Sequence, residues 1–434
     1  AVLSALALSI LAFFFFRPSR PNIVFLLIDT VRADHLSLFG YERDTSPNID
    51  AFAAENLNFL CAVAPAPWTP ASMASIFTGV YSSAHRMSPP NNRALAVKIS
   101  YKLSEQFETM AETLKKGGYQ TAAIITNPWM KPEFAVARGF DSYTYLDRAP
   151  AEKVNVAAFK LIRLLKKKRA PFFLYLHYMD AHNPYQPPKE YAARYQGPLR
   201  SRQYPPQQVE YMRLYDGAIR YLDANLGDLF SFLKQEGLYQ DTRIILAADH
   251  GEQFMEHGNQ YHGYTLYNEE IRVPLVIKAP KLNGAVDHPV SLIDIYPTIL
   301  EMAGVKPHPH QGYSLISELH KRAQLGVLSE VHRDFSSKAY IAPHGEKVIF
   351  DYDLALGLVV KPSQSPQSII TTRPGGTHIA SEEPFVDETA KRLLRKEFIK
   401  LYQETLGFSK SANQSEMVIQ EETLKQLHSL GYVK

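Results

Sequence analysis

The sequence has few cysteines and no strong excess of charge of either sign. Its one cysteine, Cys61, can form neither an internal disulfide nor a metal cluster built from thiolates. The 47 basic and 44 acidic residues leave a formal net charge of +3, which argues against nucleic acid as a partner. Repeats and low-complexity tracts are also absent. What remains is a globular chain of 434 residues, 45% of them apolar.

Charge is missing altogether from residues 1–16, which end just before the basic residues Arg17 and Arg20. Such a segment is compatible with a lipid bilayer, although a complete span needs about 17–25 apolar residues. We interpret residues 1–16 as a truncated membrane anchor. A signal peptide and a buried core helix are the alternatives, but four phenylalanines before the basic pair make a poor cleavage site.

Continuous apolar runs alternate with helical patterns from residue 21 to about residue 323. Runs of this kind are typical of strands buried on both faces, and they lie at 23–28, 121–126, 172–178, 244–248 and 273–277. Helical patterns lie at 104–116, 154–168, 207–235 and 293–302. The alternation predicts an α/β fold with a mostly parallel central sheet and helices on both faces.

The pattern changes near residue 324, where shorter predicted strands begin at 325–331, 339–341 and 348–353. A stretch rich in Pro, Ser, Thr and Gly at 361–377 is typical of a loop, and helices are predicted at 387–405 and 421–430. We therefore predict a first domain over 21–323 and a smaller α+β subdomain over 324–434.

Polar side chains follow several of the predicted strands. Asp249 and His250 come after the fourth apolar run, and carboxylate and imidazole are both ligands for divalent transition metals. An Asp-His pair alone is equally typical of a helix cap. Asp29 ends the first run in the same way, and a parallel sheet brings such residues to one edge. We therefore predict a metal site formed by Asp29, Asp249 and His250.

Thr69 precedes a helical pattern that Gly79 closes. One interpretation is an N-cap, in which the hydroxyl accepts a hydrogen bond from a free amide of the first turn. The other is a nucleophile, because a hydroxyl at a helix N-terminus beside a metal can ionise and attack phosphorus or sulfur. The two roles are compatible, and both stay open at this point.

Several long motifs together resemble the sulfatase family of the alkaline phosphatase superfamily. They are PNIVFLLIDTVRADHLSLFGYERDTSPNID from residue 21, APWTPASMASIFTGVYSSAH up to residue 85, LYLHYMDAHNPYQPP at 174–188, YDGAIRYLD at 215–223, ADHGEQFMEHGNQYHGYTLYNEEIRVPLVI at 248–277, SLIDIYPTILEMAG at 291–304 and LKQLHSLGYV at 424–433. The resemblance covers most of the chain and is weakest over 348–383. It implies a sulfatase-like fold and an enzyme that acts on phosphate or sulfate esters.

The nucleophile position departs from the family pattern. In sulfatases the residue aligned with Thr69 is a cysteine or serine that is converted to formylglycine, which threonine cannot form. Cys61 lies eight residues earlier, outside that motif, and Met73 stands where the family has a supporting arginine. The family's Asp-Asn pair is Asp249-His250 here, which shifts the expected metal from Ca²⁺ toward Zn²⁺ or Mn²⁺. The family's lysine is also absent from the segment around Asn127.

The remaining residues resemble the one-metal site of phosphoethanolamine and phosphoglycerol transferases, which use a threonine nucleophile. The predicted metal ligands are Asp29, Thr69, Asp249 and His250. The resemblance implies that His182 and His262 hold the oxygens of the substrate and assist the leaving group, and Asn127 is a further candidate for substrate binding. His177 and His257 we interpret as ordinary hydrogen-bonding residues.

These inferences predict a metal-dependent hydrolase or transferase that acts on phosphodiesters or sulfate esters through a covalent Thr69 intermediate. It would use one divalent ion, Zn²⁺ or Mn²⁺ before Ca²⁺ or Mg²⁺, and no formylglycine. The alternatives are a sulfatase that works without formylglycine and a catalytically inactive binding protein. We expect a lipid or glycan ester as substrate, a membrane anchor, and a catalytic domain in the periplasm or outside the cell.

Overall fold

An eight-stranded sheet forms the centre of the computed structural model, which describes residues 20–87, 99–197, 199, 204–332, 335–353, 368–374, 382–384, 387–408 and 415–430. The strand order is β13-β2-β12-β8-β1-β7-β5-β6. The bounds are β1 Asn22–Ile28, β2 Leu57–Phe59, β5 Gln120–Ile125, β6 Ser142–Tyr145, β7 Phe172–Tyr178, β8 Thr242–Ala247, β12 Leu275–Lys278 and β13 Gly284–Val286. Strands β8, β1, β7, β5 and β6 are parallel, whereas β12 is antiparallel to both its neighbours. The predicted, mostly parallel sheet is confirmed.

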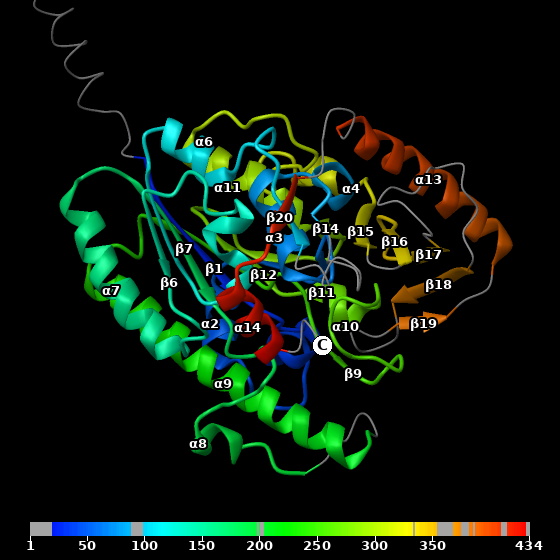
Figure 1. The fold of residues 1–434 in the computed structure, drawn as a ribbon, viewed down its shortest axis with the longest axis horizontal. Helices are drawn as coiled ribbons and strands as arrows, with labels where there is room; N and C mark the ends of the chain where they lie inside the picture. Colours follow the sequence, from blue (N-terminus) through cyan, green and yellow to red (C-terminus); the bar gives the residue numbers. More distant parts are fainter. Residues whose placement is uncertain are drawn as a thin grey trace, which may run out of the picture.

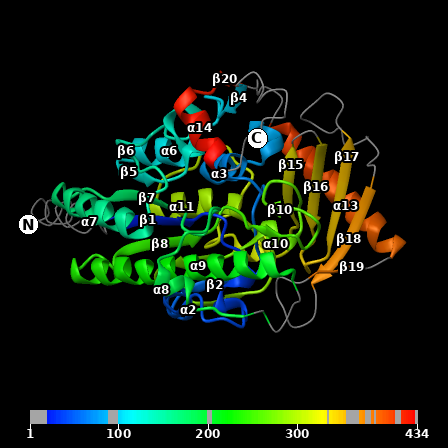
Figure 2. The same ribbon diagram turned by 60° about the horizontal axis from the view of Figure 1, so that its bottom comes forward.

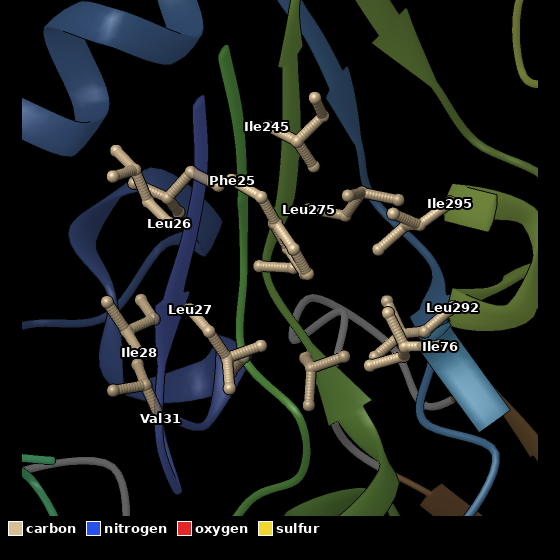
Figure 3. Packing of buried hydrophobic residues seen from close by; sticks show 14 of the residues in the cluster. Phe25, Leu26, Leu27, Ile28, Val31, Ile76, Ile245, Leu275, Leu292 and Ile295 are labelled. Carbon is tan, nitrogen blue, oxygen red and sulfur yellow. The ribbon is translucent and has the colours of Figure 1, made fainter. Parts of the chain in front are cut away.

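Strand β1 lies in the middle of this sheet and is covered on both faces. Its residues from Ile23 to Ile28 are fully buried. Successive side chains of a strand point to opposite faces. Figure 3 shows Phe25 and Leu27 facing the side of Ile76, and Leu26 and Ile28 facing the other. A continuous apolar run is therefore what this position requires, because both faces of the strand meet a packed layer.

Helices form one layer on each face of the sheet (Figures 1 and 2). The helices α2, α7 and α9 pack together on one face, and α3, α6 and α11 on the other. Their bounds are α2 Pro47–Ala54, α3 Thr69–Thr78, α6 Met110–Lys116, α7 Ala151–Lys167, α9 Pro206–Gln235 and α11 Ile295–Ala303. Shorter elements lie between them: α4 Ser82–His85, α8 Lys189–Ala192, α10 Asn268–Ile271, α12 Leu319–Arg322, β3 Ala62–Val63, β9 Gln253–Phe254, β10 Gln260–Tyr261, β11 Arg272–Val273 and β14 Val290–Ser291.

Two elements predicted before residue 324 differ from the structure. The run at 273–277 is two strands in different sheets, because Pro274 has no N–H to continue a ladder and separates β11 from β12. The helix predicted at 104–116 begins only at Met110. Thr109 accepts a hydrogen bond from Glu112 N, and the Glu112 side chain accepts one from Thr109 N, so this capping box fixes the start of α6.

A second, antiparallel sheet follows in the order β15-β16-β17-β18-β19, with α13 packed beside it (Figure 1). The bounds are β15 Val327–His332, β16 Phe335–Ile341, β17 Lys347–Asp353, β18 Ser368–Pro374, β19 Glu382–Pro384 and α13 Glu388–Gly407. The loop predicted at 361–377 is wrong where β18 lies, because these residues pair with β17. The Ile-Ile-Thr-Thr sequence of β18 favours a strand.

The end of the described chain returns to the first region. Strand β20, Ser415–Val418, pairs with β4, Ile99–Lys102, and helix α14, Glu421–Ser429, contacts the segment Pro128–Met130. Both views show α14 well apart from α13. The boundary at residue 324 stays a prediction.

The predicted anchor at residues 1–16 lies outside the described residues. Among the helices that the structure describes, none combines the length and the apolar character needed to cross a bilayer.

Candidate metal and active site

The carboxyl ends of four neighbouring parallel strands carry the predicted site. Asp249 follows β8, Asp29 follows β1, His182 follows β7 and Asn127 follows β5. These strands are adjacent in the sheet, so one edge collects side chains that lie far apart in the sequence. Ligands of open α/β sheets bind at this edge.

The two carboxylate oxygens of Asp29 have different surroundings. Oδ2 accepts hydrogen bonds from Asn127 Nδ2 at 2.7 Å and from His177 Nε2 at 3.1 Å. Oδ1 is buried and has no hydrogen-bond partner among the described residues. Burial alone would raise the pKa of Asp29, but the hydrogen bond from His177 and the nearby His182 keep that pKa well below its ordinary value. Asp29 is therefore a buried carboxylate with one oxygen available for a cation.

The turn after β1 brings Asp29 beside the end of β8. Thr30 has a φ of 60°, a left-handed conformation that costs a non-glycine residue about 1 kcal/mol. Its N–H points to Asp249 Oδ1 at 3.3 Å, and its carbonyl accepts a hydrogen bond from the Tyr215 hydroxyl at 2.7 Å. These two hydrogen bonds hold the turn and join the carboxyl ends of the two strands.

Asp249 and His250 complete the group of charged residues. Asp249 Oδ2 is buried, has no hydrogen-bond partner in the described part of the chain, and lies 3.4 Å from His250 Nε2. His250 Nδ1 lies 2.9 Å from the Gly251 carbonyl, which can only accept, so Nδ1 carries the proton and Nε2 of the neutral ring keeps its lone pair. Burial, followed by the charge of Asp29, raises the pKa of Asp249 to about 6.

Gly251 is required by the close approach of another segment. A Cβ at this position would lie 2.0 Å from the carbonyl oxygen of Glu269, and Gly251 N donates to the Glu270 carbonyl at 2.7 Å. Only glycine fits this contact. It fixes the direction in which His250 leaves the end of β8.

This arrangement fits a divalent cation. The ligand atoms offered by Asp29, Asp249 and His250 all lie within 4.8 Å of one another, and all three side chains are buried. Two buried carboxylates with unpartnered oxygens repel each other unless a positive charge lies between them. The imidazole nitrogen adds a ligand that suits Zn²⁺ or Mn²⁺ better than Ca²⁺.

Thr69 lies against this group and does not cap its helix. It is the first residue of α3, where Trp68 holds the N-cap position and no side chain accepts a capping hydrogen bond. Thr69 Oγ1 lies 3.0 Å from His250 Nε2, within hydrogen-bonding distance, and the residue is fully buried. Of the two roles considered for Thr69, the N-cap is therefore not the one that its side chain adopts.

Two further histidines lie beside the metal ligands. The rings of His250 and His262 are 4.4 Å apart, and those of His262 and His182 are 5.1 Å apart. His262 Nδ1 lies 2.8 Å from Glu252 Oε1. When Glu252 is ionised, its oxygen can only accept a hydrogen bond, and Nδ1 is then the donor. The Tyr185 hydroxyl donates to Glu252 Oε2 at 3.0 Å. Burial lowers the pKa of His182 to about 4 and raises that of Glu252 to about 7.

The structure brings together all seven residues predicted for the site, although their roles stay predictions. Sequence reasoning missed Glu252. His177 is a hydrogen-bonding residue, as interpreted, and its partner is Asp29 of the site. In the sequence, His177 lies within an apolar run. The signal for it is that it is a polar residue near the carboxyl end of β7, the strand next to β1, in register with Leu27. His257 lies outside the site, stacked on Tyr267 at 3.5 Å.

Met73, which stands at the position of the family's arginine, and the single cysteine are both buried. Met73 is fully buried, and its sulfur lies 3.9 Å from the Tyr175 hydroxyl, so a neutral contact replaces the family's arginine. Cys61 is free and buried in the segment between β2 and β3, and burial raises its pKa. A buried thiol with a raised pKa is a poor nucleophile.

Comparison with known proteins identifies the family of the chain. The model of the sulfatase family matches residues 21–305, which is well over half of the chain. An uncharacterized sulfatase of Escherichia coli K12, YidJ, is 25% identical over 381 residues, covering 72% of this chain and 73% of that protein. Arylsulfatase K of Bos taurus is 42% identical over 123 residues, which is 25% of this chain and 23% of its own length.

Solved structures show the same fold. The putative sulfatase YidJ of Bacteroides fragilis has a TM-score of 0.69 at 18% identity, covering 96% of this chain and 98% of that one. A protein solved with D-glucosamine-2-N,6-O-disulfate as its substrate has a TM-score of 0.67 at 17% identity, covering 94% and 98%. The protein therefore belongs to the sulfatase family and is an ester hydrolase of the alkaline phosphatase superfamily.

Proposed function

We propose that the protein is a metal-dependent sulfuric ester hydrolase that works without formylglycine and uses Thr69 as its nucleophile. One observation carries the proposal: the Thr69 hydroxyl lies 3.0 Å from His250 Nε2, next to two carboxylates with unpartnered oxygens. The family supports a sulfate ester as substrate over the phosphodiester favoured by the resemblance to transferases.

The metal ligands in this proposal are Asp29, Asp249, His250 and Thr69. A divalent ion bound there supplies positive charge that favours ionisation of the threonine hydroxyl and offsets the negative charge of the sulfate. Asn127 and His177 hold Asp29 Oδ2, so that Oδ1 keeps its direction. Such supporting hydrogen bonds set the orientation of a ligand and its basicity.

The reaction requires a nucleophile and a proton donor on opposite sides of sulfur. The Thr69 hydroxyl gives its proton to water, and Oγ1 forms a bond to sulfur while the bond from sulfur to the leaving oxygen breaks. Protonated His262 then gives its Nε2 proton to that oxygen, while His182 contacts the sulfate. Water attacks the sulfur of the sulfated threonine, which releases hydrogensulfate and restores the hydroxyl.

A sulfated glycan is the substrate class that the similar structures support. One of them was solved with a sulfated glucosamine as its substrate. The lipid ester considered from the sequence depends on the membrane anchor, which lies in residues that the structure does not describe. Attachment to a membrane, and a catalytic domain in the periplasm or outside the cell, stay part of the proposal.

The test compares two reporters on the purified protein supplied with Mn²⁺ or Zn²⁺: 4-nitrophenyl sulfate and bis(4-nitrophenyl) phosphate. We expect a higher kcat/KM for the sulfate. Rapid acid quenching followed by peptide mass spectrometry should find a sulfo group on Thr69. A label on another residue, or formylglycine at any position, contradicts the proposal.

A phosphodiesterase or phosphotransferase is the second candidate, and a specific feature favours it. Thr69 and the Asp249-His250 pair resemble the site of threonine-dependent phosphotransferases more closely than that of a formylglycine sulfatase. A higher kcat/KM for the phosphodiester, with a phospho group on Thr69, would establish this candidate. Absence of turnover for both reporters, with no metal bound, would indicate the inactive binding protein.

A further inference from the structure

A cavity of about 660 Å³ is lined in part by His182, whose ring centre lies 5.1 Å from that of His262. Its walls come from the connection between β6 and α7, the connection between β7 and α8, helix α9 and the end of α14. Its volume lies within the range of ligand-binding cavities in proteins, about 300–1,000 Å³. His182 belongs to the cavity lining and to the proposed reaction site, so a group bound in this cavity adjoins that site.

The cavity combines flat apolar surface with polar groups. Pro184, Pro187 and Leu430 contribute apolar surface, while Asn183 and Gln186 contribute amides. Asp180 Oδ1 accepts a hydrogen bond from Ala151 N at 3.0 Å, which caps helix α7, and its Oδ2 has no partner among the described residues. A ring that has C–H faces and hydroxyl groups matches such a surface, because the faces pack on the prolines and the hydroxyls exchange hydrogen bonds with the polar groups.

The charge of the cavity restricts the ligand further. Three acidic residues line it, Asp147, Glu152 and Asp180, against one basic residue, Arg148. The guanidinium of Arg148 is already engaged, with Nη1 donating to Ser429 Oγ at 2.9 Å and Nε 3.6 Å from Asp147 Oδ1. Asp147 and Arg148 therefore offset each other, and burial raises the pKa of Asp180 to about 7. The net charge of the lining is still negative, and it comes mainly from Glu152. It disfavours a second anionic group and tolerates a neutral or cationic one.

We propose that this cavity binds the leaving group of the ester, and that this group is a neutral or amine-bearing sugar ring without a second sulfate or carboxylate. The inference rests on the proposed function for the identity of the bond that is cleaved. It adds the chemistry of the leaving group and assigns Glu152 as a residue that determines specificity. Glu152 lies in the first turn of α7, is exposed to the cavity, and plays no part in the metal group.

The test is a ratio of specificity constants. Glucosamine 6-sulfate carries one sulfate, and glucosamine-2-N,6-O-disulfate places a second anion on the same ring, so their kcat/KM ratio measures charge selection. We expect the wild type to prefer the monosulfate. Glu152→Lys should reduce that preference by about tenfold, because it replaces a repulsive charge with an attractive one. Asp228→Lys, the same change on the exposed face of α9, should leave the ratio unchanged.

A second reporter separates specificity from damage to the site. Asp228→Lys should cleave 4-nitrophenyl sulfate at the wild-type rate, because Asp228 lies on the exposed face of α9 and outside the cavity. An equal fall for all three esters, or an unchanged ratio in Glu152→Lys, overturns the inference. So does a wild-type preference for the disulfate.

A binding measurement separates this inference from the proposed function. Unsulfated glucosamine and glucuronate are titrated into the metal-loaded protein by calorimetry. We expect glucosamine to bind and glucuronate not to bind, with the order reversed or abolished in Glu152→Lys. If no ester is cleaved but this order holds, the proposed function fails and the cavity assignment stands. If sulfate esters are cleaved but neither sugar binds at millimolar concentration, the cavity assignment fails alone.

Discussion

At the scale of single residues, the position that matters most is Thr69. Its hydroxyl lies against His250, a predicted metal ligand, and α3 has no side-chain cap because Trp68 holds the N-cap position. Loss of a stabilising cap is the kind of local cost that functional sites carry.

Replacing Thr69 tests whether the hydroxyl is the nucleophile. Thr69→Ala should lower kcat for 4-nitrophenyl sulfate by about 10³-fold or more while the protein still binds metal, because removing a nucleophile removes the covalent step. Thr69→Ser should keep substantial activity. The control is Thr78→Ser at the other end of α3, where the hydroxyl donates to the Ala74 carbonyl. Wild-type kcat in Thr69→Ala would contradict the assignment.

Glu252 is a positioning residue in this interpretation, because its contact is with His262 and not with the substrate. Glu252→Gln should lower kcat/KM by about 10- to 100-fold for an alkyl sulfate, whose poor leaving group needs a proton, and far less for 4-nitrophenyl sulfate. The measurement is the dependence of kcat/KM on the pKa of the leaving group, which should become steeper.

The matched control for Glu252 is Glu236→Gln, a surface residue paired with Arg163 at 2.8 Å. It should leave the leaving-group dependence unchanged. A purely structural role for Glu252 predicts an equal loss for alkyl and aryl esters, and that result would remove His262 as the proton donor.

At the scale of elements, the strands were predictable where their environment is uniform. β1, β5, β7 and β8 are covered on both faces, so an apolar run suffices to identify them. β18 was missed because a strand of a small antiparallel sheet, here between β17 and the edge strand β19, needs no such run. The grouping of Asp29, Asp249 and His250 was predictable because these residues follow the ends of strands, whereas Glu252 depends on where the chain folds after β8, which local sequence does not specify.

A buried ion pair joins the second sheet to the region around α4. Lys338 Nζ in β16 lies 2.7 Å from Glu330 Oε1 in β15, and Ser82 and Ser83 of α4 donate to the same carboxylate. Lys338 also lies 4.4 Å from the centre of the Tyr402 ring in α13. Lys338 and Glu330 are fully buried, so loss of one partner leaves an uncompensated charge.

Lys338→Met should therefore lower the free energy of unfolding by about 3–5 kcal/mol at neutral pH, measured by urea denaturation. The double variant Lys338→Met with Glu330→Gln should recover part of that loss, because it removes the stranded charge. Lys391→Met, which breaks an exposed pair with Glu388, should cost less than about 1 kcal/mol. Equal losses in the buried and exposed variants would contradict this account.

The same pair predicts a dependence on pH. Burial alone would raise the pKa of Glu330, but Lys338 lowers it from 4.5 to about 2. A depressed carboxylate pKa stabilises the fold above the unfolded-state value, and the contribution is lost as pH falls from about 4.5 toward about 2. In Lys338→Met, burial dominates and raises the pKa of Glu330. Protonation of Glu330 would therefore stabilise this variant as pH falls. The difference in unfolding free energy between wild type and variant should therefore narrow on acidification.

At the scale of the whole molecule, the metal group joins segments from across the first region. Asp29 ends β1, Asp249 and His250 follow β8, and Thr69 begins α3, so the group links the central sheet to one helical layer. A ligand that binds only the folded state stabilises the whole cooperative unit. The two unpartnered carboxylate oxygens are a cost to the fold that a bound cation would offset.

Metal addition should accordingly raise the melting temperature of the chelator-treated protein. At a free metal concentration 100 times the Kd, the expected gain is about 2.7 kcal/mol, a rise of several degrees by differential scanning calorimetry. Asp29→Asn should abolish the response, because it removes one of the two ionised ligands. Asp287→Asn, with a side chain 95% exposed, should respond like the wild type. A rise in melting temperature of equal size in Asp29→Asn would mean that the stabilising ion binds elsewhere, because this variant lacks one of the two carboxylates at this edge of the sheet.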